Sequence, residues 1–128
     1  MGFRRKAWLA AGLVAVAAVG PSLPTSAHHS YAMFDRNKPL TLTGRVMQVQ
    51  WQNPHAYVFL EASGPDGVTR RYLLECSSPN ELVRWGWRAN TVKSGDVITA
   101  DLYMLRDGRP GGLLFKMTTA DGTAYHAH

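Results

Sequence analysis

Residues 56–87 read AYVFLEASGPDGVTRRYLLECSSPNELVRWGW, and this stretch decides the fold. It contains two runs rich in aromatic and β-branched residues, 56–62 and 68–76, which favour β-strands. The SGPDG segment between them is dense in turn formers and predicts a tight hairpin loop. The hydrophobic period then changes at residues 78–81, Ser-Pro-Asn-Glu, a capping box with proline at the first helical position. The stretch therefore predicts two strands followed by a short helix.

The β pattern continues on both sides of this stretch. Upstream, apolar residues alternate from Leu40 to Trp51 and change parity near Val46, which predicts a β-bulge in a bent strand. Downstream, residues 97–105 and 113–119 have the composition of two further strands. We therefore expect an all-β fold, mainly β with one short helix, in the order strand-strand-strand-helix-strand-strand. This is the order of a five-stranded OB-like barrel, although a plain β-sandwich or another small barrel would share most of these signals.

The N-terminus has the layout of an export signal. Three basic residues at 4–6 precede an apolar run over 7–19, and small residues up to Ala27 offer a cleavage point. The run is shorter than the roughly 20 residues that a transmembrane helix needs. We expect residues 1–27 to be a signal peptide, and the protein to be periplasmic or secreted with no stable membrane anchor after cleavage. A retained anchor is the alternative.

Length and charge limit the function further. A chain of 128 residues allows a single domain, and we expect an extended arm over 28–39, the β domain over 40–120 and a flexible tail over 121–128. Loss of the signal would reduce 14 basic residues to 11 against 9 acidic ones, which leaves a net charge of +2. Such a weakly charged domain does not predict a nucleic-acid partner. The single cysteine, Cys76, ends an apolar strand and is expected to be a buried small hydrophobe.

Four short motifs occur together in the chain. They are AHHS at 27–30, WxNPH at 51–55, SPxxLxRxGW at 78–87 and LRDG at 105–108. In this combination the chain resembles a family of small exported bacterial proteins of unknown function. The resemblance spans nearly all of the mature chain and implies export and a single small β domain. It implies no activity, so residue roles have to come from chemistry.

His28 would be the first residue of the mature chain after cleavage behind Ala27. Its α-amine and imidazole Nδ1 can then chelate one metal ion, and a further imidazole completes a three-nitrogen site of the histidine-brace type, which suits Cu(II). We expect the third ligand to be His55, in the turn between the first two strands, or His29. Cleavage one residue earlier would leave Ala27-His28-His29, which can bind Cu(II) in a square plane. The alternative is that the His-His pair is only a polar start to the mature chain.

A second candidate surface needs no metal. In an OB barrel, the turn after Trp51 and the loop at 106–112 flank the usual binding face. The candidate residues on this face are Trp51, Asn53, Tyr57, Arg106 and Arg109. They would form a non-metal binding module for an envelope protein, a peptide or a glycan. The arginines would suit a carboxylate or phosphate, although charged loop residues are more often only solvated.

The remaining signals favour a binding protein over an enzyme. The sequence shows no nucleophile-base-acid order, paired carboxylate motif or glycine-rich phosphate loop. An oxidative copper enzyme ranks last, because so small a domain shows no evident extended surface for a substrate. Copper is the expected cofactor, and a metal-delivery or envelope protein is the partner class that this function suggests. His126 and His128 are expected to bind metal only adventitiously, from the flexible tail. Trp85 is expected to plug one end of the barrel, and Trp87 to cover an adjacent edge.

Overall fold

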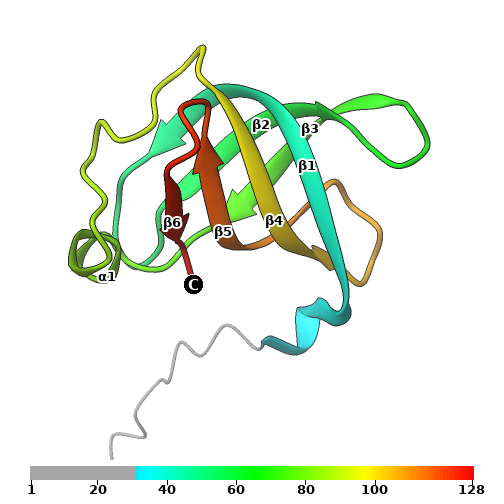
Figure 1. Cartoon of the computed structure of the whole chain (residues 1–128). Helices are drawn as coiled ribbons and strands as arrows, with labels where there is room; N and C mark the ends of the chain where they lie inside the picture. Colours follow the sequence, from blue (N-terminus) through cyan, green and yellow to red (C-terminus); the bar gives the residue numbers. More distant parts are fainter. Residues whose placement is uncertain (1–30) are drawn as a thin grey trace, which may run out of the picture.

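The computed structural model describes residues 31–128 and is mainly β with one short helix. The expected signal peptide at 1–27, together with His28 and His29, lies outside the described residues. The elements are η1 (Tyr31–Met33), β1 (Phe34–Gln50), β2 (Tyr57–Ser63), β3 (Thr69–Glu75), α1 (Pro79–Arg84), β4 (Val97–Leu105), β5 (Gly111–Thr119) and β6 (Ala124–His126) (Figure 1). The predicted order of five strands and a helix is therefore confirmed from β1 to β5. Within residues 31–128, no helix is long and apolar enough to cross a membrane.

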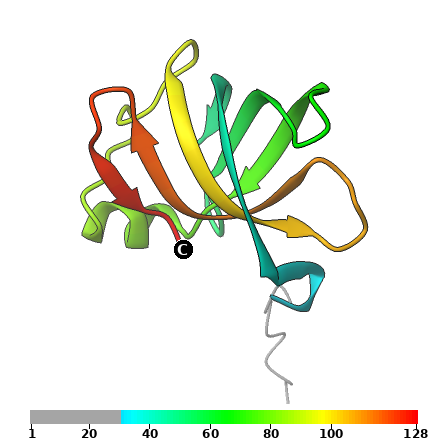
Figure 2. The same cartoon turned by 45° about the vertical axis from the view of Figure 1, so that its right-hand side comes forward.

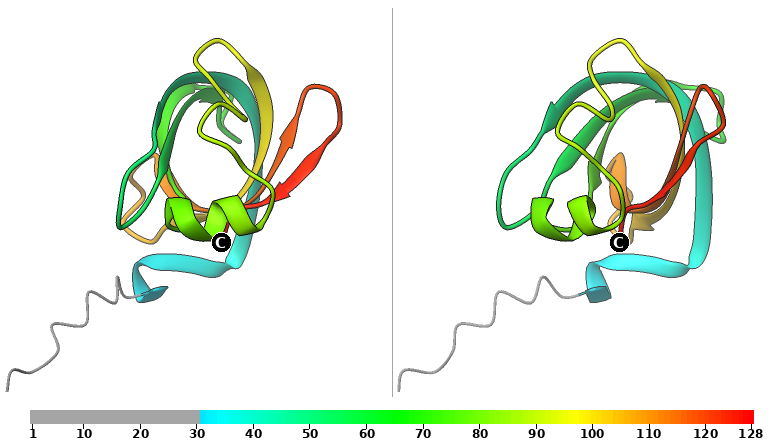
Figure 3. Two further views of the ribbon diagram at one scale, coloured as in Figure 1. Left: turned by 90° about the vertical axis from the view of Figure 1, so that its left-hand side faces the viewer. Right: turned by 60° about the vertical axis from the view of Figure 1, so that its left-hand side comes forward.

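All strands of the described chain belong to one sheet in the order β3-β2-β1-β4-β5-β6. Neighbours along this order are antiparallel, and β3 also pairs with β5 in parallel, between residues 73–75 and 111–113. The pairings of β3, β2, β1, β4 and β5 therefore close into a cycle, which we call the strand ring. Figure 3 shows the strands curving around a common interior. β6 lies outside the ring, as an antiparallel addition to β5, so the sheet has six strands where five were predicted.

β1 is the long strand that joins the two halves of the ring (Figure 2). Its later part pairs with β2 and its earlier part with β4. The register with β2 shifts between Val46 and Gln48, which confirms the predicted bulge near Val46. β1 begins at Phe34, inside the segment expected to be an extended arm, because Phe34 pairs with Leu105 and is only 3% exposed.

The core fills the interior of the strand ring. Alternate residues of β2, β3 and β4 point inward, as the period of a strand requires. The buried set includes Leu42, Val46, Val58, Leu60, Leu74, Ile98, Leu102, Leu114 and Met117. Cys76 belongs to it and is 1% exposed, which confirms the expected buried thiol. Burial, together with the charge of Glu75, raises the pKa of this thiol to about 12.

α1 begins at the predicted capping box. The Ser78 hydroxyl accepts from the Glu81 backbone N–H, and the Glu81 carboxylate accepts from the Ser78 N–H. Gly86 follows the helix with φ of +93°, a left-handed conformation that turns the chain back toward the sheet. In consequence Trp87 is 2% exposed and Trp85 is 37% exposed. The expected roles of the two tryptophans are thus reversed.

The C-terminal tail was expected to be flexible over 121–128, but it forms β6 and packs on the sheet. Ala127 is fully buried; its N–H donates to the Phe115 carbonyl at 3.0 Å, and its carbonyl accepts from the Ser77 N–H at 2.9 Å. These partners lie 12 and 50 residues earlier in the sequence. Long-range bonds of this kind, absent from any local pattern, order the tail.

Candidate functional site

His55 precedes β2 and is held by contacts to the end of β3. Its Nδ1 lies 3.1 Å from the Cys76 carbonyl oxygen and 3.6 Å from a carboxylate oxygen of Glu75. A neutral ring that donates from Nδ1 to these oxygens carries its lone pair on Nε2. Metal-binding histidines commonly show this arrangement, in which the other ring nitrogen donates to a carbonyl or carboxylate. The His55 ring is therefore held in place by a carbonyl and a carboxylate, both on its Nδ1 side.

The C-terminal strand supplies two further imidazoles. Because Ala127 points into the core, His126 and His128 lie on the opposite side of the chain. Both line one surface pocket of about 460 Å³, which we call the C-terminal pocket; its other walls are Tyr31, Arg36, Tyr103, Leu113 and Phe115. Sequence reasoning had dismissed these histidines. The signal that could have found them is the alternation of Tyr125 and Ala127 with His126 and His128, which is the pattern of a strand.

His128 lies within electrostatic range of several charged or titratable groups. Its pKa is lowered, first because burial disfavours the imidazolium form, and then because a protonated His55 would repel it. Glu81 acts in the opposite direction, whereas His126 and Arg36 lower the pKa further. The His128 ring is therefore mainly neutral at pH 7, the form whose lone pair can coordinate a metal.

η1 brings the beginning of the described chain to the same place. The rings of Tyr31 and His128 meet edge to face, with centroids 5.3 Å apart. The Arg36 guanidinium lies 5.9 Å from the ring centroids of both Tyr31 and Tyr103, within the range of cation–π attraction. The two ends of the described chain, residues 31 and 128, are thus neighbours.

A complete metal centre is not present in the described part of the chain. No three side chains of His, Cys, Asp or Glu within residues 31–128 are grouped so that they would hold an ion. His55, His126 and His128 therefore do not form such a group with other residues of this range. The ligand roles of His28 and His29 concern residues outside this range and stay predictions.

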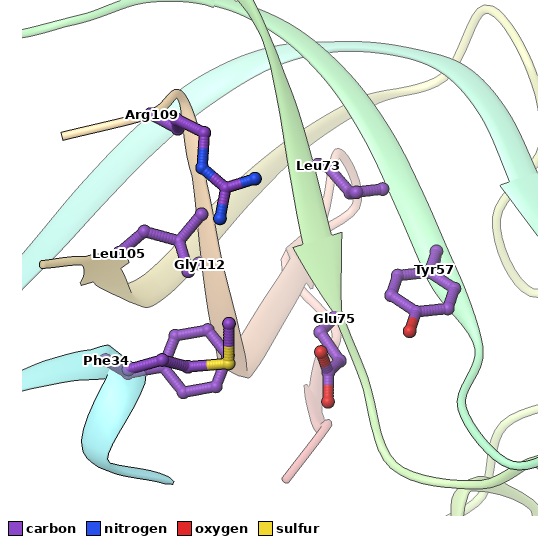
Figure 4. A pocket seen from close by; sticks show the side chains of 8 residues that line it. Phe34, Tyr57, Leu73, Glu75, Leu105, Arg109 and Gly112 are labelled. Atoms are coloured by element: carbon purple, nitrogen blue, oxygen red, sulfur yellow. The ribbon is translucent and has the colours of Figure 1, made fainter. Parts of the chain in front are cut away.

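Two of the five predicted binding-face residues line a second pocket, from opposite sides of it (Figure 4). Tyr57 and Arg109 line this cavity of about 190 Å³, the Arg109 pocket, together with Met33, Phe34, Leu73, Glu75, Leu105 and Gly112. Burial raises the pKa of Tyr57, and the charges of Glu75 and Cys76 add to this. Arg109 also donates from Nε to a carboxylate oxygen of Asp107 at 2.7 Å. The pocket thus combines an apolar wall, which includes the exposed Leu73, with one cationic and one acidic group.

The other three predicted residues lie outside that pocket. Arg106 donates from Nε to the Ala32 carbonyl at 2.9 Å and lies 3.8 Å from the Asp35 carboxylate, so it fastens η1 to the end of β4. Trp51 is half-buried and packs against the core, and Asn53 is exposed. The five predicted residues therefore do not share one surface. Tyr57 and Arg109 line the pocket, whereas the other three lie elsewhere.

Comparison with known proteins assigns the chain to a family and to nothing narrower. The model of a family described as a family of unknown function (DUF6152) matches residues 15–116. This agrees with the resemblance to a family of unknown function that the motifs indicate. The matched range includes His28, His55 and both predicted binding loops, and it ends before β6. No curated protein and no solved structure matches the chain.

Proposed function

The chain belongs to the family of unknown function DUF6152, and we propose that it is a small exported protein that binds a copper ion at one end of the strand ring. Cleavage after Ala27 would make His28 the first residue of a periplasmic or secreted chain. The α-amine and imidazole of His28 supply two nitrogens, and His55 supplies a third. Three nitrogens in a T-shaped arrangement suit Cu(II). His29 is the alternative third ligand.

The observation that carries this proposal is the contact between Tyr31 and His128. His128 is in turn close enough to His55 for their charges to interact. His28 precedes Tyr31 by three residues, and consecutive Cα atoms are about 3.8 Å apart, so the Cα of His28 can be no more than about 11 Å from that of Tyr31. The chain is therefore short enough to keep the mature N-terminus near the described imidazoles.

The orientation of the His55 ring supports the same role. Its Nδ1 faces the Cys76 carbonyl and the Glu75 carboxylate, an arrangement that is common among metal-bound histidines. A ligand that is fixed before the ion arrives loses little conformational freedom on binding. The anchored ring of His55 thus suits the role of the third ligand.

We further propose that the strand ring is an OB-like barrel. The support is its five strands and the position of α1 between β3 and β4, as in that fold. On this assignment β6 and η1 are additions, and both lie beside the C-terminal pocket. The copper ion would then sit at the edge of the barrel, away from its packed interior.

Intact mass measured under native conditions tests the copper proposal. Untagged protein, exported by its own signal, is measured with and without an equimolar amount of Cu(II). We expect a chain that begins at His28 and retains one copper ion, which is lost in His28→Ala and in His55→Ala. Gln52→Ala, an exposed change in the same turn as His55, is the matched control and should retain copper.

Two outcomes would overturn the brace. A chain that begins well away from His28, or one that retains no copper, removes the metal-binding function. A chain that begins at Ala27 and loses copper only in His29→Ala replaces the brace with a square-planar site formed by the first three residues.

The Arg109 pocket favours a second function, that of a non-metal binding module. Its exposed Leu73 and its Arg109 guanidinium offer an apolar wall and a cation to a peptide or glycan that carries a carboxylate. This function predicts that acidic peptides or glycans shift the NMR signals of the Leu73 methyl groups, and that Arg109→Ala abolishes the shift. Arg71→Ala, on the same strand as Leu73, is the control. Copper should leave these signals unchanged.

A further inference from the structure

We infer that the C-terminal pocket binds a small aromatic carboxylate, such as benzoate, independently of copper. Neither proposed function uses this pocket, since the second one is assigned to the Arg109 pocket. Its volume of about 460 Å³ lies within the range of small-molecule sites, which is about 300–1,000 Å³. Its walls come from η1, β1, β4, β5 and the C-terminal residues, so the pocket exists only in the folded chain.

A series of ring contacts orders the walls of the pocket. The rings of Phe115 and Tyr103 are stacked, with centroids 4.6 Å apart. The Arg36 guanidinium lies 5.9 Å from the Tyr103 and Tyr31 centroids, and the Tyr31 ring meets the His128 ring at 5.3 Å. Five of the seven side chains that line the pocket are thus linked one to the next. A site whose walls are ordered before the ligand arrives loses less conformational freedom on binding.

The two walls that come from the ends of the described chain are also anchored through their backbone. The Trp87 indole N–H donates to the His126 carbonyl at 2.8 Å, which holds the C-terminal wall. Arg106 donates from Nε to the Ala32 carbonyl at 2.9 Å, which holds η1. Each of these walls is therefore fixed by a side chain from a distant part of the sequence.

The charge of the lining favours an anion. Arg36 is the lining residue with a permanent positive charge, and none of the seven is acidic. Within residues 31–128, the Arg36 guanidinium forms no ion pair with a carboxylate. A guanidinium presents parallel N–H donors that match the two oxygens of a carboxylate. A carboxylate on the ligand would thus supply an ionic partner for Arg36.

The apolar part of the lining favours a flat ring in the rest of the ligand. Tyr31, Tyr103 and Phe115 contribute three aromatic rings, and Leu113 adds an aliphatic wall. Aromatic rings attract a further ring through offset-stacked or edge-to-face contacts. Burial is the main cause that lowers the pKa of His128, so its ring is mainly neutral at pH 7 and offers one N–H donor and one acceptor. That donor suits a carboxylate oxygen or a hydroxyl group on the ligand.

Two other classes of ligand fit this lining less well. A sugar carries many hydroxyl groups that need donors and acceptors, and no Asp, Glu, Asn or Gln side chain lines the pocket. A phosphate dianion would meet one guanidinium among largely aromatic walls, where an incompletely paired charge is costly. An aromatic ligand with a single carboxylate is therefore the class that the lining favours.

NMR titration of the copper-free protein tests this assignment. The probes are benzoate, benzamide and cyclohexanecarboxylate, which separate the effect of the charge from that of the aromatic ring. We expect benzoate to shift the ring signals of Tyr103 and Phe115. It should bind at least about tenfold more tightly than benzamide, because a hydrogen bond to a charged group contributes about that much. Cyclohexanecarboxylate, which has the charge but no aromatic ring, should bind more weakly than benzoate.

Two variants locate the binding. Arg36→Gln should weaken benzoate binding at least about tenfold and leave benzamide binding unchanged. Because Arg36 is exposed, this variant should keep the wild-type melting temperature. Arg45→Gln, an exposed change on the same strand and outside the pocket, is the matched control and should bind benzoate like the wild type. Tyr103→Leu removes an aromatic wall and should weaken the binding of benzoate and benzamide alike.

Four outcomes would overturn the inference. If benzoate leaves the Tyr103 and Phe115 signals unchanged, the pocket is not its site. If Arg36→Gln binds benzoate like the wild type, or if Arg109→Gln abolishes binding instead, the carboxylate lies elsewhere. If cyclohexanecarboxylate binds as tightly as benzoate, the walls do not select an aromatic ring. None of these results bears on copper binding, which the intact mass tests separately.

Discussion

Replacing Trp87 with phenylalanine should destabilise the protein strongly and loosen its C-terminal strand. The indole is 2% exposed, packs against Tyr125 with ring centroids 5.6 Å apart, and donates to the His126 carbonyl at 2.8 Å. Phenylalanine keeps an aromatic ring at this position but has no N–H. The substitution therefore removes both part of the core and the bond that joins the α1 region to β6.

The size of the effect follows from these two losses. An indole buries more surface than a phenyl ring, and a difference of about 40 Å² at about 25 cal/mol per Å² corresponds to about 1 kcal/mol. The lost hydrogen bond, which leaves a half-buried carbonyl without its donor, adds about 1–2 kcal/mol. The free energy of unfolding should thus fall by about 2–3 kcal/mol, which lowers the melting temperature by about 10–20 °C for a domain of this size.

Denaturant and thermal unfolding of the copper-free protein, followed by circular dichroism, measure this change. Trp85→Phe is the control: its ring is 37% exposed, and a change at such a surface position should alter the free energy of unfolding by less than about 0.5 kcal/mol. If Trp85→Phe cost as much as Trp87→Phe, Trp85 would be the residue that plugs the core, and the reasoning from burial would be refuted.

Three further changes test other parts of the structure. Cys76 should not react with an aromatic disulfide reagent in the folded protein and should react fully in denaturant, because burial holds its thiol pKa at about 12; fast labelling of the native state would contradict its burial. Gly44→Ala should lower the free energy of unfolding by about 1–3 kcal/mol, since a Cβ there would clash with the Glu61 carbonyl oxygen on β2; an unchanged denaturation midpoint would show that the β1–β2 contact is looser. Burial raises the pKa of Asp101, but hydrogen bonds from Lys116 and Thr41 and the Lys116 charge lower it more, so the net shift is downward from 3.8. The folded carboxyl group then binds protons less readily than the unfolded one, so its stabilising contribution is present above pH 3.8 and is lost as the pH falls below that value. Asp101→Asn should therefore lose less stability between pH 6 and pH 3 than the wild type does; equal losses would contradict the shift.

The sequence predicts the elements of this fold well where the signal is local. The capping box at 78–81 places the start of α1, because its two reciprocal hydrogen bonds join residues three apart. The change of parity at Val46 places the bulge, because side chains in a strand alternate with a period of two. β4 has the same bounds in the sequence and in the structure, 97–105, since its apolar run is long and ends in a loop rich in turn formers.

Features that depend on distant partners are not visible in such patterns. β6 is three residues long, and the buried residue that follows it bonds to Phe115 and Ser77, far away in the sequence. The two tryptophans beside Gly86 could not be ranked by burial, because the turn at that glycine decides which ring enters the core. The short strand β6 thus explains why the tail was wrongly predicted to be flexible. The turn at Gly86 explains why the burial of Trp85 and Trp87 was predicted the wrong way round.

The candidate site divides in the same way. His55 was selected because it stands in a short turn with a distinctive composition; the structure adds the bonds of its ring, and its ligand role stays a prediction. The position of His128 beside Tyr31 was not predicted, because it depends on β6. The contacts of Arg106 to Ala32 and Asp35 were not foreseen, because they join the end of β4 to the beginning of the described chain, which no spacing reveals.

The contact between Tyr31 and His128 also means that the chain can be rejoined and opened elsewhere. A circular permutant that links residue 128 to residue 31 through a short spacer, with new ends in the exposed turn at 65–67, should fold, since tips of exposed loops tolerate such cuts. Its strands would pair as before, but it would have no free amine beside His55. The fold would then persist without the copper site. Strand pairing does not depend on which residue begins the mature chain, whereas the proposed copper site needs the free α-amine of His28.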